Sequence, residues 1–275
     1  MSDWRIHILA NGRFSVRFCT EEGLELMPSM ENIPSLVFLL QSGSRCLIVD
    51  TGFDPEDVGG QGSSAVQGQG ESLTEGLKGL GLAPGDISDV LMTHLHWDHT
   101  AGMGLFPGAR FHVQADALRC FCNLNPNEET YYRPGHWLHL LDRMVFVEGS
   151  HELMPGIRLH HTGGHCPGHQ AVLVETGQGT VALAGDLPFD YSGLWSALPA
   201  DFWETYRRGK GGRLWWTKEQ WETLYAFMEK KGLMNQPCQA ESLGYGKLRR
   251  MCSRVFLTHA PELYPSPVGV LSVPV

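Results

Sequence analysis

The chain has 275 residues, 42% of them hydrophobic and 19% charged, which describes a globular protein long enough for a sizeable core. Its net charge of −9 and the lack of any basic run exclude nucleic acid as an expected partner. No apolar run approaches the roughly 20 residues of a membrane span, and the N-terminus lacks a signal-peptide profile. We therefore expect a cytoplasmic protein with no membrane partner and with free thiols at its cysteines.

Residues 4–50 read as β-strands. The Asn11-Gly12 pair predicts a tight turn between two of them, because this dipeptide readily adopts positive φ. The last strand of this region, residues 46–49, ends at Asp50. The Asp50 carboxylate is a candidate for orienting a histidine ligand from behind, and an equally good reading makes it a turn or helix-cap carboxylate.

The next region predicts a loop, a helix and a strand. Residues 59–70 are rich in Gly, Gln and Ser, which favours a flexible loop, either a mobile rim over a site or a tolerated insertion. Leucines repeat with helical spacing from Leu73 to Leu80, and Gly81 suits the C-terminal end of that helix. Residues 87–93 then form a short β-prone run that leads into the most informative stretch of the chain.

Four potential metal ligands follow this run within six residues: His94, His96, Asp98 and His99. In an extended or loop backbone alternate side chains point the same way, so His94, His96 and Asp98 can converge. His99 then faces a neighbouring point. One short loop can therefore serve two metal positions a few Å apart, unlike the helical HExxH zinc motif, which this sequence lacks.

Three further candidate ligands, His165, Asp186 and His259, each lie just after or at the end of a later β-prone run. A β-framework that gathers strand-end loops at one edge would bring them to the first loop. Imidazole and carboxylate ligands without thiolate suit Zn²⁺, Mn²⁺ or Fe²⁺. Two ions that share a carboxylate can hold hydroxide between them, and Asp98 beside it could bind one ion and also shuttle the proton.

Two regions carry weaker signals. Residues 123–143 look irregular, and we interpret His136 and His139 there as ordinary hydrogen-bonding side chains. Residues 190–250 break the strand rhythm, contain five of the eight tryptophans and include an amphipathic helix predicted over 218–231. This region either packs on the main body, forms a contact in a homodimer, or provides an apolar wall for an acyl or aromatic substrate.

The motifs resemble, in their order, those of the metallo-β-lactamase superfamily, from about residue 33 to residue 260. The matching motifs are Asp50-Thr-Gly, His94-x-His96-x-Asp98-His99, Gly164-His165-Cys-Pro-Gly, Gly185-Asp186 and Thr258-His259. The resemblance implies an α/β fold, an αββα sandwich, as a single domain over residues 1–275 with a Trp-rich, partly helical insertion at about 190–250. It also implies the metal ligands: His94, His96 and His165 for the first ion, Asp98, His99 and His259 for the second, and Asp186 as the bridge.

Within the superfamily, residues at the site favour some branches over others. His99 and Asp186 disfavour the class B1 β-lactamases, which have Arg and Cys there, and His96 disfavours the di-iron oxygen-reducing branch, which usually has Glu. The net negative charge and the lack of a basic patch argue against the tRNA-processing nucleases. The stretch 164–170 and the overall length resemble the N-acyl homoserine lactone lactonases most.

This resemblance implies a dinuclear metal-dependent hydrolase that opens a lactone or related ester by attack of hydroxide on a polarised carbonyl. Two divalent ions are expected, Zn²⁺ first, with Fe²⁺ and Mn²⁺ as alternatives. A glyoxalase II-like thioester hydrolase stays open as an alternative, although the sequence shows no clear Lys/Arg set for the glutathione carboxylates. An iron-dependent oxygenase of the same fold also stays open, because the ligand types do not separate iron from zinc.

The sequence also departs from the lactonase pattern. Gly163 stands where Pro is common, and Cys166, where Thr or Ser is common, is interpreted as a neighbour of the site and not a ligand. Tyr191 is offset from the tyrosine that contacts the substrate carbonyl in lactonases, and is kept as a candidate substrate contact. His169 is a candidate for supporting a metal ligand from behind. The long insertion leaves room for a different lactone or ester as the substrate.

Overall fold

The computed structural model describes residues 4–17, 29–59, 62–121, 124, 129–189, 226, 230, 248, 251–265 and 270–273. The predicted Trp-rich insertion at 190–250 lies outside the described residues except for 226, 230 and 248, and the predicted substrate contact Tyr191 lies outside them as well. Within the described part of the chain, no helix combines the length and apolar character needed to cross a bilayer.

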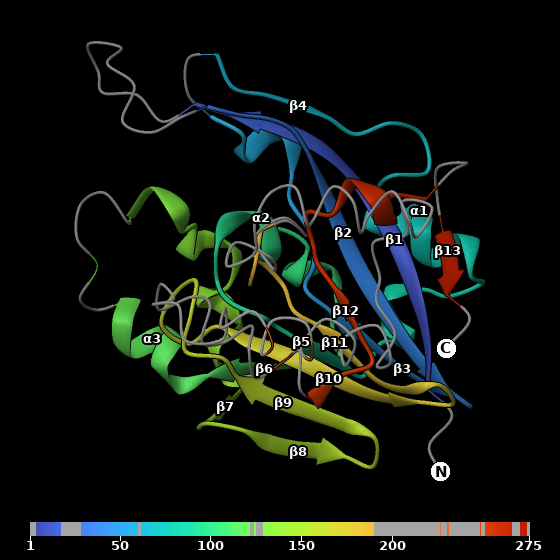
Figure 1. Ribbon diagram of the computed structural model, residues 1–275. Helices are drawn as coiled ribbons and strands as arrows, with labels where there is room; N and C mark the ends of the chain where they lie inside the picture. Colours follow the sequence, from blue (N-terminus) through green and yellow to red (C-terminus); the bar gives the residue numbers. More distant parts are fainter. Residues whose placement is uncertain are drawn as a thin grey trace.

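Two β-sheets form the body of the molecule (Figure 1). The large sheet has the strand order β13-β1-β2-β3-β5-β6-β7, with β4 paired to β1. Its strands are β1 (Arg5–Val16), β2 (Met30–Ser42), β3 (Arg45–Val49), β4 (Ser64–Val66), β5 (Asp89–Leu91), β6 (Arg110–Gln114), β7 (Met144–Val147) and β13 (Val270–Val273). The small sheet has the order β12-β11-β10-β9-β8. Its strands are β8 (His151–Met154), β9 (Ile157–His161), β10 (Gln170–Thr176), β11 (Gly179–Leu183) and β12 (Arg254–Phe256).

The described helices are short. The α-helices are α1 (Leu73–Gly79), α2 (Trp97–Thr100) and α3 (Ala115–Phe121). The 3₁₀ turns are η1 (Pro55–Asp57), η2 (Pro84–Asp86), η3 (Met103–Leu105), η4 (Glu129–Tyr131), η5 (Pro134–His136), η6 (Leu138–Arg143) and η9 (Pro261–Leu263). The predicted helix at Leu73 is confirmed. Its N-terminus is closed by a capping box in which the Ser72 hydroxyl accepts from the Glu75 backbone and the Glu75 carboxylate accepts from the Ser72 backbone.

The apolar run in β2 is buried on both faces of the large sheet. Phe38 points between the sheets and stacks on Phe256 of β12, with ring centroids 6.3 Å apart. Its neighbour Leu39 points the other way, into a second core that includes Leu77 of α1. A strand covered on both faces reads as a continuous apolar run, which is what the sequence shows. The predicted sandwich is therefore confirmed for the described residues.

The predicted turn at Asn11-Gly12 is wrong, because β1 continues through it as a β-bulge. Ala10 pairs with Leu36 and Arg13 with Pro34, so β1 has one residue more than β2 between these pairs. Gly12 takes φ +94°, a conformation that suits glycine in a bulge as well as in a turn. The local preference of Asn-Gly for positive φ is met, but long-range pairing with β2 decides the path of the chain.

Part of the Gly-rich segment 59–70 forms a strand where a loop is predicted. Its central residues form β4, which pairs antiparallel with β1 through Ser64, Ala65 and Val66. Gly68 donates its backbone N–H to the Glu71 carboxylate at 2.5 Å, which closes the end of the segment. β4 is only three residues long, so it depends on the edge that the long strand β1 offers.

The ends of five strands lead to one place at the edge of the two sheets. β3, β5, β9, β11 and β12 are each followed, within a few residues, by one of the sequence motifs. Gln170 fastens the two sheets there: its backbone N–H donates to the carbonyl of Thr93 at 2.8 Å, and its amide donates to the carbonyl of Met92 at 2.7 Å. The edge that receives the motifs is therefore held by hydrogen bonds as well as by apolar packing.

Candidate metal centre

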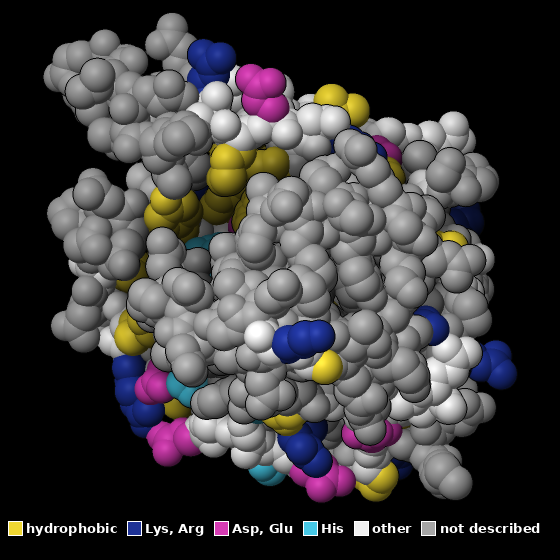
Figure 2. Space-filling model, in the orientation of Figure 1, with side chains coloured by type: hydrophobic (Ala, Val, Ile, Leu, Met, Phe, Trp, Pro, Cys, Tyr) yellow, Lys and Arg dark blue, Asp and Glu magenta, His cyan; other side chains and the backbone are white. Residues whose placement is uncertain are grey.

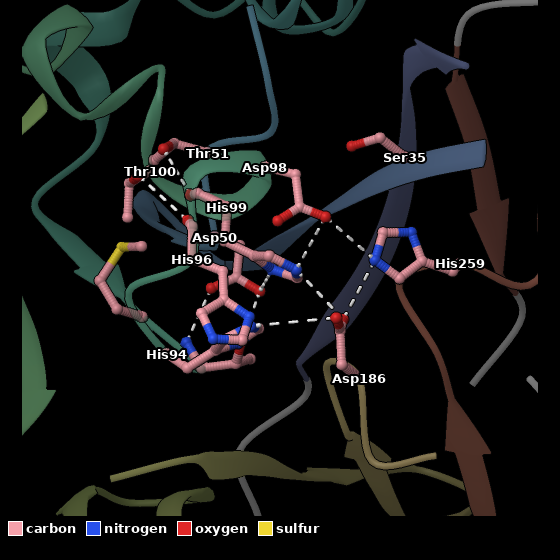
Figure 3. A network of polar contacts seen from close by, with 12 residues as sticks. Ser35, Asp50, Thr51, His94, His96, Asp98, His99, Thr100, Asp186 and His259 are labelled. Carbon is pink, nitrogen blue, oxygen red and sulfur yellow. Dashed lines mark hydrogen bonds and ion pairs between the residues drawn. The ribbon is translucent and has the colours of Figure 1, made fainter. Parts of the chain in front are cut away.

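Seven histidine and aspartate side chains from four separate stretches converge at this edge. Figure 3 shows how Asp98, His99, Asp186 and His259 face one another, with His94 and His96 beside them. They form two groups, each with ligand atoms within 4.8 Å of one another: His94, His96 and His165 in the first, and Asp98, His99, Asp186 and His259 in the second. The resemblance implies the same division of the six other side chains, with Asp186 as a bridge and not as a member of one group. Each group has the residue types and the spacing to hold one metal ion.

Residues 94–99 contribute side chains to both groups, because the backbone changes conformation within this stretch. His94 and His96 follow β5 in extended chain, so alternation points them the same way, as predicted. α2 then begins at Trp97, with His96 as its N-cap residue, so Asp98 and His99 lie in a helical turn. The expectation that Asp98 joins His94 and His96 by alternation is therefore wrong, because a helical turn directs Asp98 toward His99 and the second group.

Asp186 lies between the two groups, with one carboxylate oxygen toward each. Its Oδ1 is 3.1 Å from His99 Nε2 and 3.2 Å from His259 Nε2, both in the second group. Its Oδ2 is 3.6 Å from His165 Nε2 and 3.9 Å from His94 Nε2, both in the first group. This is the geometry of a carboxylate that could bridge two ions.

The spacing of the nitrogen and oxygen atoms fits ions at both positions. A tetrahedral zinc ion with bonds of about 2.0–2.1 Å separates its ligand atoms by about 3.3 Å. His165 Nε2 lies 3.2 Å from both His94 Nε2 and His96 Nδ1. Among the described residues, His99 Nε2, His259 Nε2 and Asp186 Oδ1 are buried without a hydrogen-bond partner. Asp186 Oδ1 lies within 3.2 Å of both nitrogens, an ion pair when the histidines are protonated, and a cation at this point would satisfy all three atoms without those protons.

Hydrogen bonds behind the second group fix which histidine nitrogen faces its centre. His99 Nδ1 donates to Asp50 Oδ2 at 2.8 Å. His259 Nδ1 donates to the Pro34 carbonyl at 2.8 Å. A neutral imidazole that donates from Nδ1 has its lone pair on Nε2, so both rings present a metal-binding nitrogen to the group.

Asp50 supports both groups at once. Its Oδ1 accepts from the Thr93 backbone at 2.7 Å, and its Oδ2 accepts from the Thr93 hydroxyl at 2.7 Å and from His99. Because the Thr93 hydroxyl proton is given to Asp50, its oxygen is left to accept from His94 Nδ1 at 2.9 Å. Asp50 holds this position with φ +60°, which aspartate tolerates better than most residues. Asp50 therefore contacts His99 directly and His94 through Thr93, and its orienting role stays a prediction.

His169 lies behind the first group and is fully buried. Its Nδ1 donates to the Thr162 hydroxyl at 2.8 Å, and its ring centroid is 5.3 Å from that of His94. Gly185, which precedes Asp186, has φ +56°, and a Cβ there would lie 2.9 Å from His169 Nε2 and 2.8 Å from the Thr93 hydroxyl. The glycine of the Gly-Asp motif is therefore required by the close packing of the residues that support the cluster.

The first group is electrostatically prepared to bind a cation. Burial, followed by repulsion from neighbouring histidines, holds the pKa of His94 well below its usual range and lowers the pKa of His96 to about 3. Burial also lowers the pKa of His165. All three imidazoles are therefore neutral at physiological pH, and their lone pairs are available without the loss of a proton.

The second group has the opposite character. Burial would lower the pKa of His259, but Asp186 and Asp98 outweigh it and raise the pKa to about 9. The same carboxylates and Asp50 raise the pKa of His99 well above its usual range against its burial. The two histidines in turn hold the pKa values of Asp98 and Asp186 low although both carboxylates are buried. A divalent ion in this group would take the place of bound protons.

Other residues near the cluster were interpreted differently or missed. Cys166 is half-buried next to His165 and belongs to neither group, so it is a neighbour as expected. Gly163 has φ +70°, which proline cannot adopt, so this departure from the common pattern follows from the backbone. Sequence reasoning missed Thr93, although its place just before His94 at a strand end was a usable signal.

An aromatic cluster beside the second group was also not foreseen. Phe14 of β1 lies against Phe53 and Trp97, with ring centroids 5.3 Å and 5.1 Å away, and 5.8 Å from the ring of His259. Phe189 stacks on His259 at 4.4 Å. These rings exclude water from the second group, which strengthens the electrostatic interactions within it. The alternating apolar positions of β1 carried this signal, but its partners are distant in sequence.

Comparison with known proteins gives the family. The metallo-beta-lactamase superfamily model matches residues 31–211, and the chain belongs to this superfamily. N-acyl homoserine lactonase AiiA of Bacillus thuringiensis subsp. kurstaki is 30% identical over 179 residues, which is 61% of this chain and 69% of that protein. N-acyl homoserine lactonase AiiB of Agrobacterium fabrum is 31% identical over 183 residues, 58% of this chain and 63% of that protein. The predicted class, a metal-dependent hydrolase, is supported by this membership.

Solved structures agree with this assignment. An N-acyl homoserine lactone hydrolase with N-hexanoyl-L-homoserine bound at its catalytic metal centre is 25% identical, with a TM-score of 0.59 over 72% of this chain and 82% of that one. A quorum-quenching N-acyl homoserine lactone lactonase gives a TM-score of 0.62 over 99% of each chain, and its 21% identity supports the fold alone.

Proposed function

We propose that this protein is a dinuclear metal-dependent hydrolase that opens lactones, with N-acyl homoserine lactones as the substrate class. The observation that carries the proposal is the position of Asp186, whose two oxygens face two separate ligand groups. His94, His96 and His165 would hold one ion, and Asp98, His99 and His259 the other. Ions bound there would polarise a carbonyl oxygen and supply a water of lowered pKa, and Zn²⁺ fits the ligand set first, with Fe²⁺ and Mn²⁺ as alternatives.

Asp98 is proposed to handle the proton. Its Oδ2 lies 3.4 Å from His259 Nε2 and 3.7 Å from His99 Nε2, and these two histidines keep the pKa of Asp98 low. It is therefore an ionised carboxylate at neutral pH and can accept a proton from the attacking water. The protonated form can then donate to the ring oxygen that leaves when the lactone opens.

Two features support a lactone over other esters. The relatives and structural neighbours that match this chain are described as N-acyl homoserine lactonases. In addition, lactone opening gives one product that retains both the carboxylate and the alcohol, so a site with two adjacent cation positions suits both oxygens. A small-molecule lactone is thus the proposed partner, and a homodimer stays a prediction that the described residues do not test.

The test is proton release by metal-loaded protein on addition of N-acyl homoserine lactones of several chain lengths, with γ-butyrolactone and a glutathione thioester alongside. We expect turnover of the acylated lactones that is abolished by a chelator and by His94→Ala. His139→Ala, on an exposed side chain outside the cluster, is the matched control and retains activity. Turnover of the thioester with no turnover of lactones would contradict the proposal and favour a glyoxalase II-like hydrolase. Inactivity towards every substrate, with oxygen uptake by the iron-loaded protein, would favour an oxygenase.

A further inference from the structure

The cluster is accessible from one side. Of its seven residues, His96 and His165 are half-buried, whereas the other five are buried. A molecule that approaches from solvent therefore meets the cluster at the first group. Figure 2 shows histidine surface next to hydrophobic side chains on this face of the molecule. The residues beside His96 are thus in a position to contact whatever part of a substrate extends away from the reacting carbonyl.

Two adjacent tyrosines stand against His96. The ring of Tyr131 lies 5.3 Å from the imidazole centroid at an interplanar angle of 31°, and the ring of Tyr132 lies 5.0 Å from it at 80°. Tyr132 is buried and its backbone pairs with His96 in an isolated antiparallel bridge. Tyr131 is half-buried, as is His96, so both adjacent rings keep part of their surface exposed to solvent.

His136 fastens this segment to the metal-binding loop. Its Nδ1 lies 2.9 Å from the Thr100 hydroxyl, in α2, and its Nε2 lies 3.0 Å from Asp57 Oδ2, in η1. The Thr100 hydroxyl is also 3.1 Å from the carbonyl of His96. His136 therefore connects three elements, η5, α2 and η1, at one point and sets the distance between the tyrosine segment and His96.

We propose that Tyr131 is a specificity-determining residue, whose ring forms the wall that contacts the apolar acyl chain of the substrate, and that His136 is the residue that positions this wall. The inference rests on the proposed function and names the part of the substrate that the wall recognises. An aromatic face has a large apolar surface with few rotatable bonds, so it can hold an alkyl chain at a low entropic cost. The wall lies against His96, a proposed metal ligand, so a chain bound there keeps its carbonyl near the cluster.

The test compares Tyr131→Ala, Tyr131→Phe and His136→Gln, each with His139→Gln as the control on an exposed histidine nearby in sequence. The substrates are N-decanoyl homoserine lactone and γ-butyrolactone, which has no acyl chain. For Tyr131→Ala we expect KM for the acylated lactone to rise about tenfold, with a smaller change in kcat and no change for γ-butyrolactone. Tyr131→Phe retains the wild-type values. His136→Gln shifts KM in the same direction as Tyr131→Ala, and metal content stays equal in all variants.

The outcomes separate this inference from the proposed function. If the wild-type protein hydrolyses the lactone but Tyr131→Ala has an unchanged KM, the inference is overturned and the proposed function stands. Equal losses of kcat/KM by Tyr131→Ala on both lactones have the same consequence. Binding of the ring-opened N-decanoyl-L-homoserine to metal-loaded protein, measured by calorimetry, gives a second readout that needs no turnover. We expect about tenfold weaker binding by Tyr131→Ala. A wild-type protein that neither hydrolyses the lactone nor binds this molecule overturns both proposals together.

Discussion

At the scale of single residues, the candidate metal centre depends on which nitrogen of each histidine faces inward. Backbone and carboxylate acceptors behind His99 and His259 hold their Nδ1 protons, and this leaves Nε2 toward the cluster. His96 differs, because its Nδ1 is the atom 3.2 Å from His165 Nε2. The supporting acceptors decide these tautomers, so they belong to the site as much as the ligands do.

Asp50→Asn tests this support directly. Asp50 accepts from the Thr93 backbone, the Thr93 hydroxyl and His99, and an amide nitrogen in place of one oxygen cannot accept. We expect metal affinity to fall about 10–100-fold, more strongly at the second group, where Asp50 contacts His99 directly. Competition with a chelating dye measures both affinities. Asp54→Asn is the control, since exposed Asp54 caps η1 instead. Unchanged affinity at both positions in Asp50→Asn would show that these contacts do not orient the ligands.

At the scale of elements, the motifs meet because strand ends and tight loops bring them to one edge. The loop between β9 and β10, residues 162–169, carries His165 with φ +60°, and Gly168 in it takes φ +79°. A Cβ at Gly168 would lie 2.3 Å from the backbone nitrogen of Ala117 in α3. The loop therefore packs backbone against backbone, and α3 sets its position.

Gly168→Ala should displace this loop. Both the positive φ and the contact with Ala117 oppose a side chain, so we expect a loss of about 1–3 kcal/mol in the free energy of unfolding, together with weaker metal binding at the first group. Gly163→Ala is a matched control in the same loop, with φ +70° but no atom within 4 Å of the added Cβ. It shares the backbone strain without the clash. Urea unfolding of both metal-free variants measures their free energies of unfolding. Equal losses in Gly168→Ala and Gly163→Ala would contradict the packing argument.

At the scale of the whole molecule, the second group links protonation, metal binding and stability. The folded, metal-free protein raises the pKa of His259 to about 9, above its ordinary value of about 6.5 in an unfolded chain. Between these values the folded state binds more protons than the unfolded state. The stabilisation is therefore complete below about pH 6.5 and is lost as pH rises through about 9.

We therefore expect the metal-free protein to become less stable between pH 6.5 and pH 9, by up to a few kcal/mol. In the metal-loaded protein the ions replace these protons, so this loss is expected to disappear and the unfolding temperature to rise at every pH. Thermal unfolding across this range, with and without a chelator, measures both effects. A metal-free protein whose stability increases over the same window would contradict the assignment of charge in the second group.

Much of this organisation could be predicted from the sequence, for physical reasons that differ between regions. The ligands are recognisable because His94, His96, Asp98 and His99 crowd into one stretch, and the sandwich follows from the ordered motifs. The bulge at Gly12 could not be predicted, because its local signal is the same as that of a turn and pairing with β2 decides between them.

Other parts of the site depend on contacts between distant stretches. His136 was interpreted as an ordinary hydrogen-bonding residue, since nothing nearby in sequence indicates that Asp57 and Thr100 are its partners. The link from Asp50 to the first group likewise passes through Thr93, 43 residues away, whereas Asp50 contacts His99 of the second group directly. The metal-ligand roles, the single domain over 1–275 and the Trp-rich insertion stay predictions.

The most direct test of the central claim is the rate of proton release from an N-acyl homoserine lactone at stepwise loading of metal-free protein with Zn²⁺. If Asp186 joins two metal positions, the rate rises until two equivalents of Zn²⁺ are bound. The Asp186→Asn variant then reaches only a small fraction of the wild-type rate at the same Zn²⁺ loading. Full turnover by metal-free protein, or a maximal rate already reached with one equivalent, would contradict a dinuclear hydrolase.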